Sequence, residues 1–483
     1  MRSEEQQKSK AEAFGRGRLA YAAASLILLI PCFWQSRLQA GDLSSHLYNA
    51  WLAQLIESGQ APGLAIGRQT TNILFDAMLS AMLRVAGAGA AQRIAVSLAV
   101  LAFVWGAFAF VSAVSGRPAW SVLPLIAVLA YGWVFHIGFF NFYISLGLCF
   151  GVLALCWEWN PRKWAGAIPV LAVAWLAHAL PVVWTFSLLA YLWLARRLRP
   201  RARLFLLVDS MAALVLVRVS LIALIRTQWF PSQVLTATGL DQVWVFDAKY
   251  ILIMLGLLLL WGFAFVTLLR RSRLRAIAAS IPFHFCVLTG FAILVLPTEV
   301  LIPGYKHSLA FIAERMSLAL GICICAFLGG ARTRAAQNYL MAIVVLLFFG
   351  FLFRDERIFN AVEDRMERVA SELSPGQRVV GAMDAPGLRV NALTHMIDRV
   401  CLGRCYSYAN YEASTAQFRI RVVAANPIVV STYEDSWALQ AGKYVVKERD
   451  LPLYEIRVDS NGRMALTSLE AGFPVSVSHW DPL

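Results

Sequence analysis

The stretch LAYAAASLILLIPCFWQSRLQAGD, residues 19–42, is an apolar run that ends at a carboxylate, Asp42. As a helix, the run 19–36 is long enough to cross a hydrocarbon layer about 30 Å thick. The whole chain shares this character, because 59% of its 483 residues are hydrophobic, only 15% are charged and the mean hydropathy is +0.62. These values exclude an ordinary soluble domain and predict an all-α polytopic membrane protein.

Eleven apolar runs of this kind occur before residue 354, and we predict that each of them spans the membrane. They cover residues 19–36, 93–114, 119–135, 142–157, 164–177, 180–195, 204–224, 250–269, 277–296, 312–329 and 338–353.

Short clusters of Arg and Lys separate the apolar runs and account for the net charge of +14. They stand in the N-terminal tail (residues 1–18), at Arg117, at Arg162 and Lys163, in RRLRPRAR (196–203), in RRSRLR (270–275) and at Arg332 and Arg334. By the positive-inside rule these positions are cytoplasmic, so the tail lies inside and the region after residue 353 lies outside, periplasmic or extracellular. Their placement between spans argues against a nucleic-acid partner and fits a multi-pass protein of the inner (plasma) membrane.

Two juxtamembrane helices are expected within residues 43–88, on the outer face. The first has an apolar stripe with a period of four, formed by Leu43, Leu47, Trp51 and Leu55. Such a stripe predicts a helix that lies flat on the bilayer. The second covers residues 71–87, which are apolar but contain Asp76 and Arg84. If it were a span, the later basic clusters would move to the outer face, so we interpret it as a surface helix.

The chain changes character after residue 353, and residues 354–483 predict a small α/β domain outside the membrane. Residues 353–377 predict an amphipathic helix, and short apolar or alternating runs beyond it predict strands. These runs are RVVGAMD (378–384), NPIVVSTY (426–433), YVVKERD (444–450), YEIRVD (454–459) and RMALTSL (463–469). Cys401 and Cys405 also lie in this domain, where an outside location favours a disulfide over a pair of free thiols.

Asp42 directly precedes the first juxtamembrane helix and has two interpretations. In one, its side chain caps the helix by accepting backbone N–H bonds. In the other, which is compatible with the first, a rigid and ionised carboxylate serves as a base that faces an acceptor hydroxyl. His46 lies one helical turn further on, beside it.

Further polar residues gather at the predicted outer ends of the spans. Charged and imidazole groups near membrane depth are costly unless they face a cavity or a partner, so we predict one polar cavity that opens outward. Its candidate residues are His46, His136, Asn141, Tyr143, His178, Arg226, Lys249, Tyr305, Lys306, His307, Glu314 and Arg315.

The chain resembles the GT-C superfamily of membrane glycosyltransferases in the region after its first span. The resemblance lies in Asp42, in the amphipathic helix of DLSSHLYNAWLAQLIESGQAP (42–62), which begins with that Asp, and in the second juxtamembrane segment. This superfamily includes the protein O-mannosyltransferases and the aminoarabinose transferase of lipid A. The resemblance covers residues 19–353 and extends to the outside C-terminal domain. It implies that Asp42 is the catalytic base or a metal-supporting carboxylate of an inverting glycosyltransferase. Arg68 stands where some relatives have a basic residue before the second juxtamembrane helix.

The chain also departs from that family. Many relatives have a second acidic residue in the next external loop, where this chain has His136, Asn141 and Tyr143. No DxD pair follows the first span. Dependence on a metal is therefore not implied, and no cofactor is assigned.

A polyprenyl-phosphate sugar donor requires a base for the acceptor hydroxyl and cations for the departing phosphate. Asp42 is the candidate base. Lys306 and Arg315 are the main candidate cations, with His307, Arg226 and Lys249 as helpers; the alternative is that these side chains extend to lipid headgroups. The substrate-binding candidates are His46, Arg68, His136, Asn141, His178 and Tyr305. The acceptor is a glycan, a lipid or a protein.

Three alternatives remain beside this hypothesis. His46, His136 and His178 together with Asp42 would suit a divalent metal. A transporter or flippase would have similar spans, although the sequence has no internal repeat and no matched pair of broken spans. A non-catalytic scaffold that presents the C-terminal domain would not require Asp42.

Overall fold

The computed structural model describes residues 17–158, 160–330, 334–458 and 463–479. The chain is mostly helical, and within these ranges five helices are long and apolar enough to cross a membrane. They are α3 (Leu74–Ser115), α8 (Ala179–Arg197), α9 (Pro200–Leu224), α11 (Ile251–Arg271) and α15 (Ala335–Ala370). The helical fold is therefore confirmed, and its long apolar helices fit a membrane protein. Most of the N-terminal tail and Arg332 lie outside the described residues.

The other predicted spans form shorter helices. They comprise residues 17–32, α4 (Leu123–Ala130), α5 (Trp133–Ile137), α6 (Phe140–Cys156), α7 (Pro161–Ala177), α13 (Ile281–Val295) and α14 (Ile312–Leu328), with α12 (Leu274–Ala278) before α13. One predicted span, 119–135, is broken into α4 and α5 at Gly132, where a Cβ atom would lie 2.4 Å from the Gln242 carbonyl oxygen. Each of the eleven predicted runs is largely helical, but how many of them span the membrane stays a prediction.

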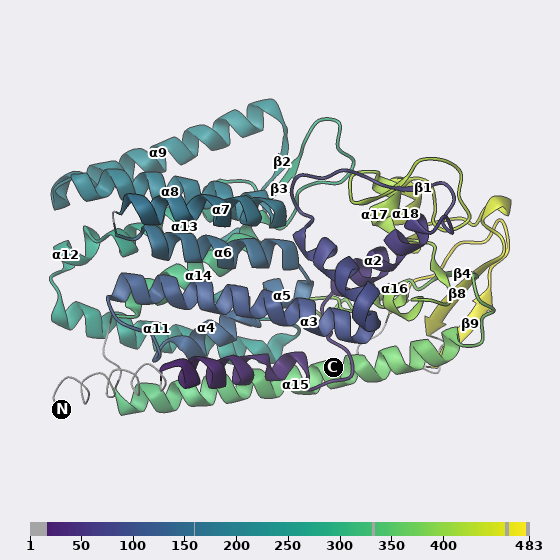
Figure 1. Cartoon of the computed structure of the whole chain (residues 1–483), viewed down its shortest axis with the longest axis horizontal. Helices are drawn as coiled ribbons and strands as arrows, with labels where there is room; N and C mark the ends of the chain where they lie inside the picture. Colours follow the sequence, from purple (N-terminus) through teal and green to yellow (C-terminus); the bar gives the residue numbers. More distant parts are fainter. Residues whose placement is uncertain (1–16, 159, 331–333, 459–462, 480–483) are drawn as a thin grey trace, which may run out of the picture.

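The helices form one bundle with the C-terminal domain at one end (Figure 1). The short helix α12 and the turn from α8 to α9 lie at the opposite end, and both carry the basic clusters. α15 runs along the bundle and continues into the domain. The last apolar run and most of the predicted amphipathic helix 353–377 form one continuous helix, so no loop separates the two parts of the chain at residue 353.

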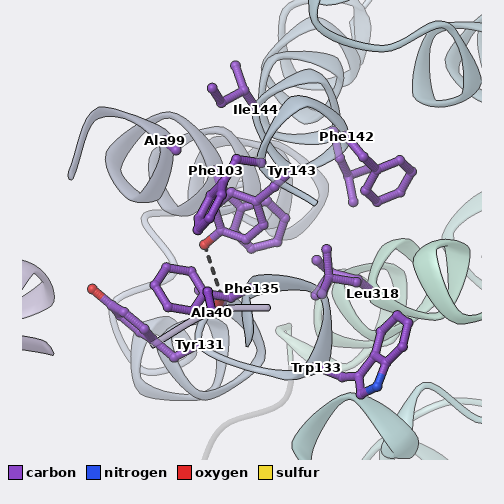
Figure 2. Packing of buried hydrophobic residues seen from close by; sticks show 14 of the residues in the cluster. Ala40, Ala99, Phe103, Tyr131, Trp133, Phe135, Phe142, Tyr143, Ile144 and Leu318 are labelled. Atoms are coloured by element: carbon purple, nitrogen blue, oxygen red, sulfur yellow. Dashed lines mark hydrogen bonds between the residues drawn. The ribbon is translucent and has the colours of Figure 1, made fainter. Parts of the chain in front are cut away.

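Buried aromatic side chains pack together inside the bundle (Figure 2). The rings of Phe103 on α3 and Tyr143 on α6 are stacked with centroids 4.4 Å apart, and the Tyr143 hydroxyl donates to the Ala130 carbonyl. Gly106 and Gly147 bring α3 and α6 into direct backbone contact, since a Cβ on Gly106 would lie 2.0 Å from the Gly147 oxygen. Small residues at such crossings allow tight helix packing in membranes. Tyr143 is thus a core residue and not part of an outer loop.

The predicted juxtamembrane region differs from expectation in one respect. α2 (Leu43–Glu57) forms as predicted, but its apolar stripe packs on protein. Leu43 and Leu47 are fully buried, and Trp51 stacks on Tyr406 of the C-terminal domain with ring centroids 6.1 Å apart. A period of four identifies a buried face, and the sequence cannot show whether lipid or protein covers it. The second segment, 71–87, is separated from the rest of α3 by a kink at Gly87.

The C-terminal domain is a small α/β unit, as predicted. Its sheet has the order β6 (Tyr406–Ser407), β4 (Arg378–Val380), β8 (Leu453–Val458) and β9 (Met464–Ser468), with only the β8–β9 pair antiparallel. Its helices are α16 (Met396–Val400), α17 (Tyr411–Thr415) and α18 (Tyr433–Gln440). Cys401 and Cys405 form the predicted disulfide. Residues 426–433 and 444–450 form no named strand, contrary to prediction.

Short strands elsewhere connect parts of the chain that are distant in sequence. β1 (Leu64–Ile66) pairs with β7 (Ile420–Val422), which joins the juxtamembrane region to the domain. β2 (Arg226–Gln228) pairs with β3 (Glu299–Leu301), and β5 (Met383–Asp384) pairs with β10 (Ser478–His479). A single turn, α10 (Gln233–Thr236), follows β2.

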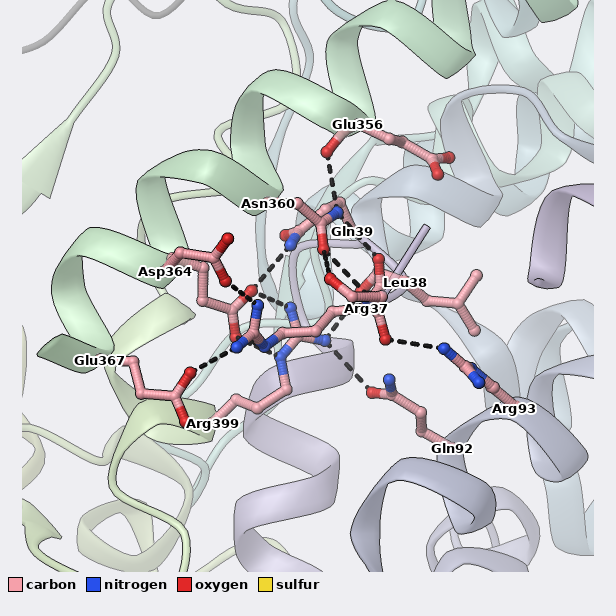
Figure 3. Close-up of polar contacts among 12 residues, drawn as sticks. Arg37, Leu38, Gln39, Gln92, Arg93, Glu356, Asn360, Asp364, Glu367 and Arg399 are labelled. Carbon is pink, nitrogen blue, oxygen red and sulfur yellow. Dashed lines mark hydrogen bonds and ion pairs between the residues drawn. The ribbon is translucent and has the colours of Figure 1, made fainter. Parts of the chain in front are cut away.

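A polar cluster fastens the domain to the bundle (Figure 3). Arg399 of α16 donates from Nε and Nη2 to the two carboxylate oxygens of Glu363 on α15, each at 2.6 Å. Gln39 donates to the same carboxylate at 2.7 Å, and Arg399 Nη1 also donates to the Leu38 carbonyl. Glu363 and Arg399 are both buried, so removing either charge is costly, although Arg37 Nε also lies 3.5 Å from Glu363 Oε1.

Candidate functional site

A polar cavity of about 350 Å³ lies where the helix ends meet the C-terminal domain. The membrane part of the chain lines it with Asp42, His46, Gln69, Asn72, Asp76, Asn141, His178, His307 and Arg315. The C-terminal domain lines it with His395, Tyr411, Glu412, Phe418, Arg419, Tyr433, Trp437 and Gln440. The predicted polar cavity therefore exists, and two distant parts of the chain form its walls.

Asp42 enters the cavity because the backbone around it is fixed. The N–H of Gly41 donates to the His136 carbonyl at 2.7 Å, and the N–H of Asp42 donates to the Ile137 carbonyl at 2.9 Å. Gly138 has φ of 94°, and a Cβ at this position would lie 2.6 Å from the Asp42 nitrogen. The capping hypothesis is wrong, because the Asp42 side chain makes no cap hydrogen bond to α2. Its carboxylate is left to face the cavity.

His46 pairs with Asp76 and not with Asp42. His46 Nδ1 lies 2.7 Å from Asp76 Oδ1, and Asn141 donates to Asp76 Oδ2 at 2.9 Å. Burial opposes a charged imidazole here, but the Asp76 charge and hydrogen bond outweigh it and raise the pKa of His46 to about 9. The cavity floor thus holds an imidazolium–carboxylate pair at neutral pH. In the sequence, Asp76 stands out only as a charge that opposes a membrane span.

Arg315 differs from Lys249, Lys306 and Arg226 because it lines the polar cavity. Its guanidinium lies 3.8 Å from the centre of the Phe139 ring, and its Nη1 is 3.2 Å from His178 Nε2. Its buried Nε has no hydrogen-bond partner in the part of the chain that the structure describes. No described carboxylate forms an ion pair with it. A half-buried cation with an unsatisfied Nε at a cavity wall is a candidate anion-binding group, and Asp42 is the carboxylate whose charge acts on it most strongly.

The remaining predicted cations lie elsewhere. Lys249 Nζ is 2.7 Å from Asp355 and 2.9 Å from Asp247, so its charge is already neutralised. Lys306 is half-exposed and lies 3.8 Å from Glu434. Arg226 and Tyr305 line a separate open hollow. Tyr305 and Lys306, in the loop after β3, are near Arg315 in sequence but do not line its cavity.

Two predicted binding residues are also outside the cavity lining. Arg68 is exposed, and its carbonyl accepts a bond from Arg421. His136 is fully buried, with Nε2 3.3 Å from Glu356 Oε1. Its contribution to the site is its carbonyl, which fixes the backbone before Asp42. His307 does line the cavity and stacks on Tyr411 with centroids 5.6 Å apart.

The proposed metal site of three histidines is not formed. His136 points to Glu356, His178 to Arg315 and His46 to Asp76, so their ring nitrogens do not converge. Across the described ranges there is no cluster of three His, Cys, Asp or Glu side chains arranged to hold a metal.

Several cavity residues of the C-terminal domain were missed by sequence analysis. His395 Nε2 lies 3.8 Å from Asp42 Oδ1. Glu412 is buried, and this burial, together with Asp76 and Asp42 nearby, raises its pKa to about 7 although His46 opposes the shift. Arg419 donates to the Asp76 carbonyl at 3.1 Å and also contacts Ser80. No recognisable motif marks these residues, since their roles follow from where the domain docks.

A second, apolar cavity of about 420 Å³ lies between α8, α9, α13 and α14. It is lined by Trp184 and Leu188 of α8, Leu288 of α13 and Met316 of α14, among others. The first turns of α14 separate the two cavities: Arg315 lines the polar one, while Ala313 and Met316 line the apolar one.

Comparison of the chain with protein-family models, with curated proteins and with solved structures finds no significant match.

Proposed function

We propose that the chain is an inverting GT-C-type glycosyltransferase that moves a sugar from a polyprenyl-phosphate donor to an acceptor hydroxyl. One observation carries the proposal: Asp42 and the unpaired Arg315 line the same polar cavity. A carboxylate and a cation in one cavity are the two kinds of group that this transfer requires.

In the proposed reaction, Asp42 removes the proton of the acceptor hydroxyl while the oxygen of that hydroxyl attacks the anomeric carbon of the donor sugar. The bond from that carbon to the phosphate oxygen breaks, and its electron pair goes to the phosphate. Arg315 stabilises the charge that develops on this leaving group, with His178 3.2 Å from its guanidinium. The ion pair of His46 with Asp76 keeps these two groups from competing for the phosphate or the acceptor proton.

The apolar cavity supports a lipid-linked donor over a water-soluble one. It begins one helical turn or less from Arg315 along α14, so a phosphate held by Arg315 would have a hydrocarbon-lined space beside it. A polyprenyl chain matches this chemistry, because a continuous hydrocarbon has no polar group to satisfy there.

We further propose that the cavity opens on the outer face of the inner membrane. The basic clusters near α12 and between α8 and α9 lie at the bundle end remote from the domain (Figure 1). The positive-inside rule assigns that end to the cytoplasm. A disulfide in the domain agrees with an oxidising compartment.

The test is transfer of radiolabelled sugar from undecaprenyl-phosphate sugars by the purified full chain. Asp42→Asn is expected to lower kcat by roughly 10²–10⁴-fold, the usual contribution of a general base. The matched control is Glu470→Gln, which removes an exposed carboxylate of the C-terminal domain. Full transfer by the Asp42→Asn variant would eliminate the base role. Donor binding by the wild type without any transfer would favour a carrier instead.

A further inference from the structure

His395 lies between two carboxylates at the junction of the domain and the bundle. Its Nε2 is 3.8 Å from Asp42 Oδ1, and its Nδ1 is 3.2 Å from Asp398 Oδ2. The side chain lines the polar cavity and is 12% exposed, so the cavity is its route to solvent. Asp42 belongs to the membrane part of the chain, whereas His395 and Asp398 belong to the domain.

The orientation of the imidazole is fixed from the domain side. Asp398 is buried and accepts a short hydrogen bond from the Ser407 hydroxyl. A carboxylate held in this way selects the tautomer with the proton on Nδ1, and the other nitrogen is then a proton acceptor. The ring of Tyr411 packs against the imidazole with centroids 5.5 Å apart. In neutral His395, therefore, the free lone pair of Nε2 faces Asp42.

We propose that His395 takes from Asp42 the proton that this carboxylate has removed from the acceptor hydroxyl. The O–H bond of the protonated Asp42 breaks, an N–H bond forms at Nε2, and Asp398 stabilises the imidazolium until water in the cavity removes the proton. His395 is a positioning residue in this scheme, because it acts on the acceptor only through Asp42. The inference rests on the proposed function and adds that the domain restores the base after each turnover.

The groups that face His395 determine how this step responds to pH. They are Asp42 before α2, Asp398 on α16 and Glu412 on α17, with the Tyr411 ring alongside. Burial lowers the pKa of His395, but the hydrogen bond and charge of Asp398, with Asp42 and Glu412, raise it above the ordinary value. Below this pKa the imidazole already holds a proton and cannot accept another. Turnover should then decline as the pH falls through it.

The first experiment does not require any substrate. Diethyl pyrocarbonate reacts with neutral imidazole, so mass spectrometry of the full chain in lipid nanodiscs measures the titration of each histidine. We expect the reaction midpoint of His395 to lie above the ordinary pKa of a histidine, and Asp398→Asn to lower it. An unchanged midpoint in Asp398→Asn would show that Asp398 does not act on this imidazole, and would overturn the inference.

The second experiment is the pH dependence of sugar transfer. We expect His395→Asn to lower kcat roughly 10–100-fold with little change in KM, the usual cost of removing such a supporting group. Asp398→Asn should keep more activity and move the acidic limb of the profile to lower pH. A merely structural role would leave that limb in place. His479→Gln is the matched control and should change neither quantity.

The outcomes separate the two proposals. If Asp42→Asn keeps full transfer, the proposed function loses its base and fails with this inference. If Asp42→Asn loses transfer while His395→Asn keeps the wild-type kcat and acidic limb, only the relay fails.

Discussion

The membrane helices and the C-terminal domain line one cavity, yet they do so by different means. The helical part contributes groups that are anomalous where they stand, such as Asp42 and Arg315 at the ends of apolar runs. The domain contributes groups that look ordinary in sequence, such as His395 and Glu412. A polar residue is informative only where its surroundings are expected to be apolar. The following predictions test whether the two regions are equally necessary.

The largest effect is expected at the junction of the two regions. Arg399→Leu leaves the buried Glu363 without its two shortest bonds, and such a change costs about 3–5 kcal/mol. Hydrogen exchange of α15 and α16 in detergent should show this loss. The control, Arg457→Leu, changes an exposed arginine on β8 and should have no measurable effect. Equal protection in both variants would mean that the cluster does not hold the domain.

Loss of the unpaired cation should be nearly as costly, but for transfer and not for folding. Arg315→Ala removes the main proposed stabiliser of the phosphate charge, a loss worth about 10²–10³-fold in kcat. Binding of undecaprenyl phosphate should weaken in parallel, whereas Arg457→Ala should alter neither. If the Arg315→Ala variant bound undecaprenyl phosphate as tightly as the wild type, the phosphate would have to bind in another part of the cavity.

The disulfide should have a smaller effect that is confined to the domain. Cys401 and Cys405 are 4 residues apart, and closing so short a loop stabilises by about 2 kcal/mol in the chain-entropy account. Cys401→Ser should lower the domain's unfolding temperature and leave sugar transfer at 25 °C near the wild-type rate. A large loss of transfer would show that this loop shapes the cavity.

The smallest effect is a dependence of stability on pH within the helical part. The pKa of His46 is raised to about 9 in the folded chain, above its unfolded value of 6.5. Its contribution is therefore complete below pH 6.5 and is lost as the pH rises through 9. Thermal unfolding between pH 6 and 10 should show this decline, and Asp76→Asn should remove it. A stability that rises over this range would contradict the ion pair.

The sequence patterns predicted the secondary-structure elements better than they predicted the contacts between those elements. Every apolar run of the membrane part is largely helical, because burial or lipid exposure requires backbone hydrogen bonds to be satisfied within the segment. The stripe from Leu43 to Leu55 correctly predicted a helix, but it was expected to lie on the bilayer and instead packs on protein. The short runs 426–433 and 444–450 were wrong as strands, since alternation over a few residues describes buried coil equally well.

The site divides in the same way. Asp42, Arg315, His178 and His307 were predicted for one cavity and line it, while Lys249, Lys306, Arg226 and His136 were predicted and lie outside its lining. The sequence places all of them near one membrane face. It does not give the direction of a side chain around its helix or loop, which differs between neighbours such as Lys306 and His307.

The amino-acid sequence by itself determined that the chain is helical and apolar, where its folded tail begins to differ, and which residues are costly at membrane depth. These are properties of single segments, because hydropathy and periodicity are local sums. Only the tertiary structure decided that α2 packs on the domain, that Arg315 has no carboxylate partner and that His395 faces Asp42. Those facts depend on atoms separated by hundreds of residues, which no local pattern encodes.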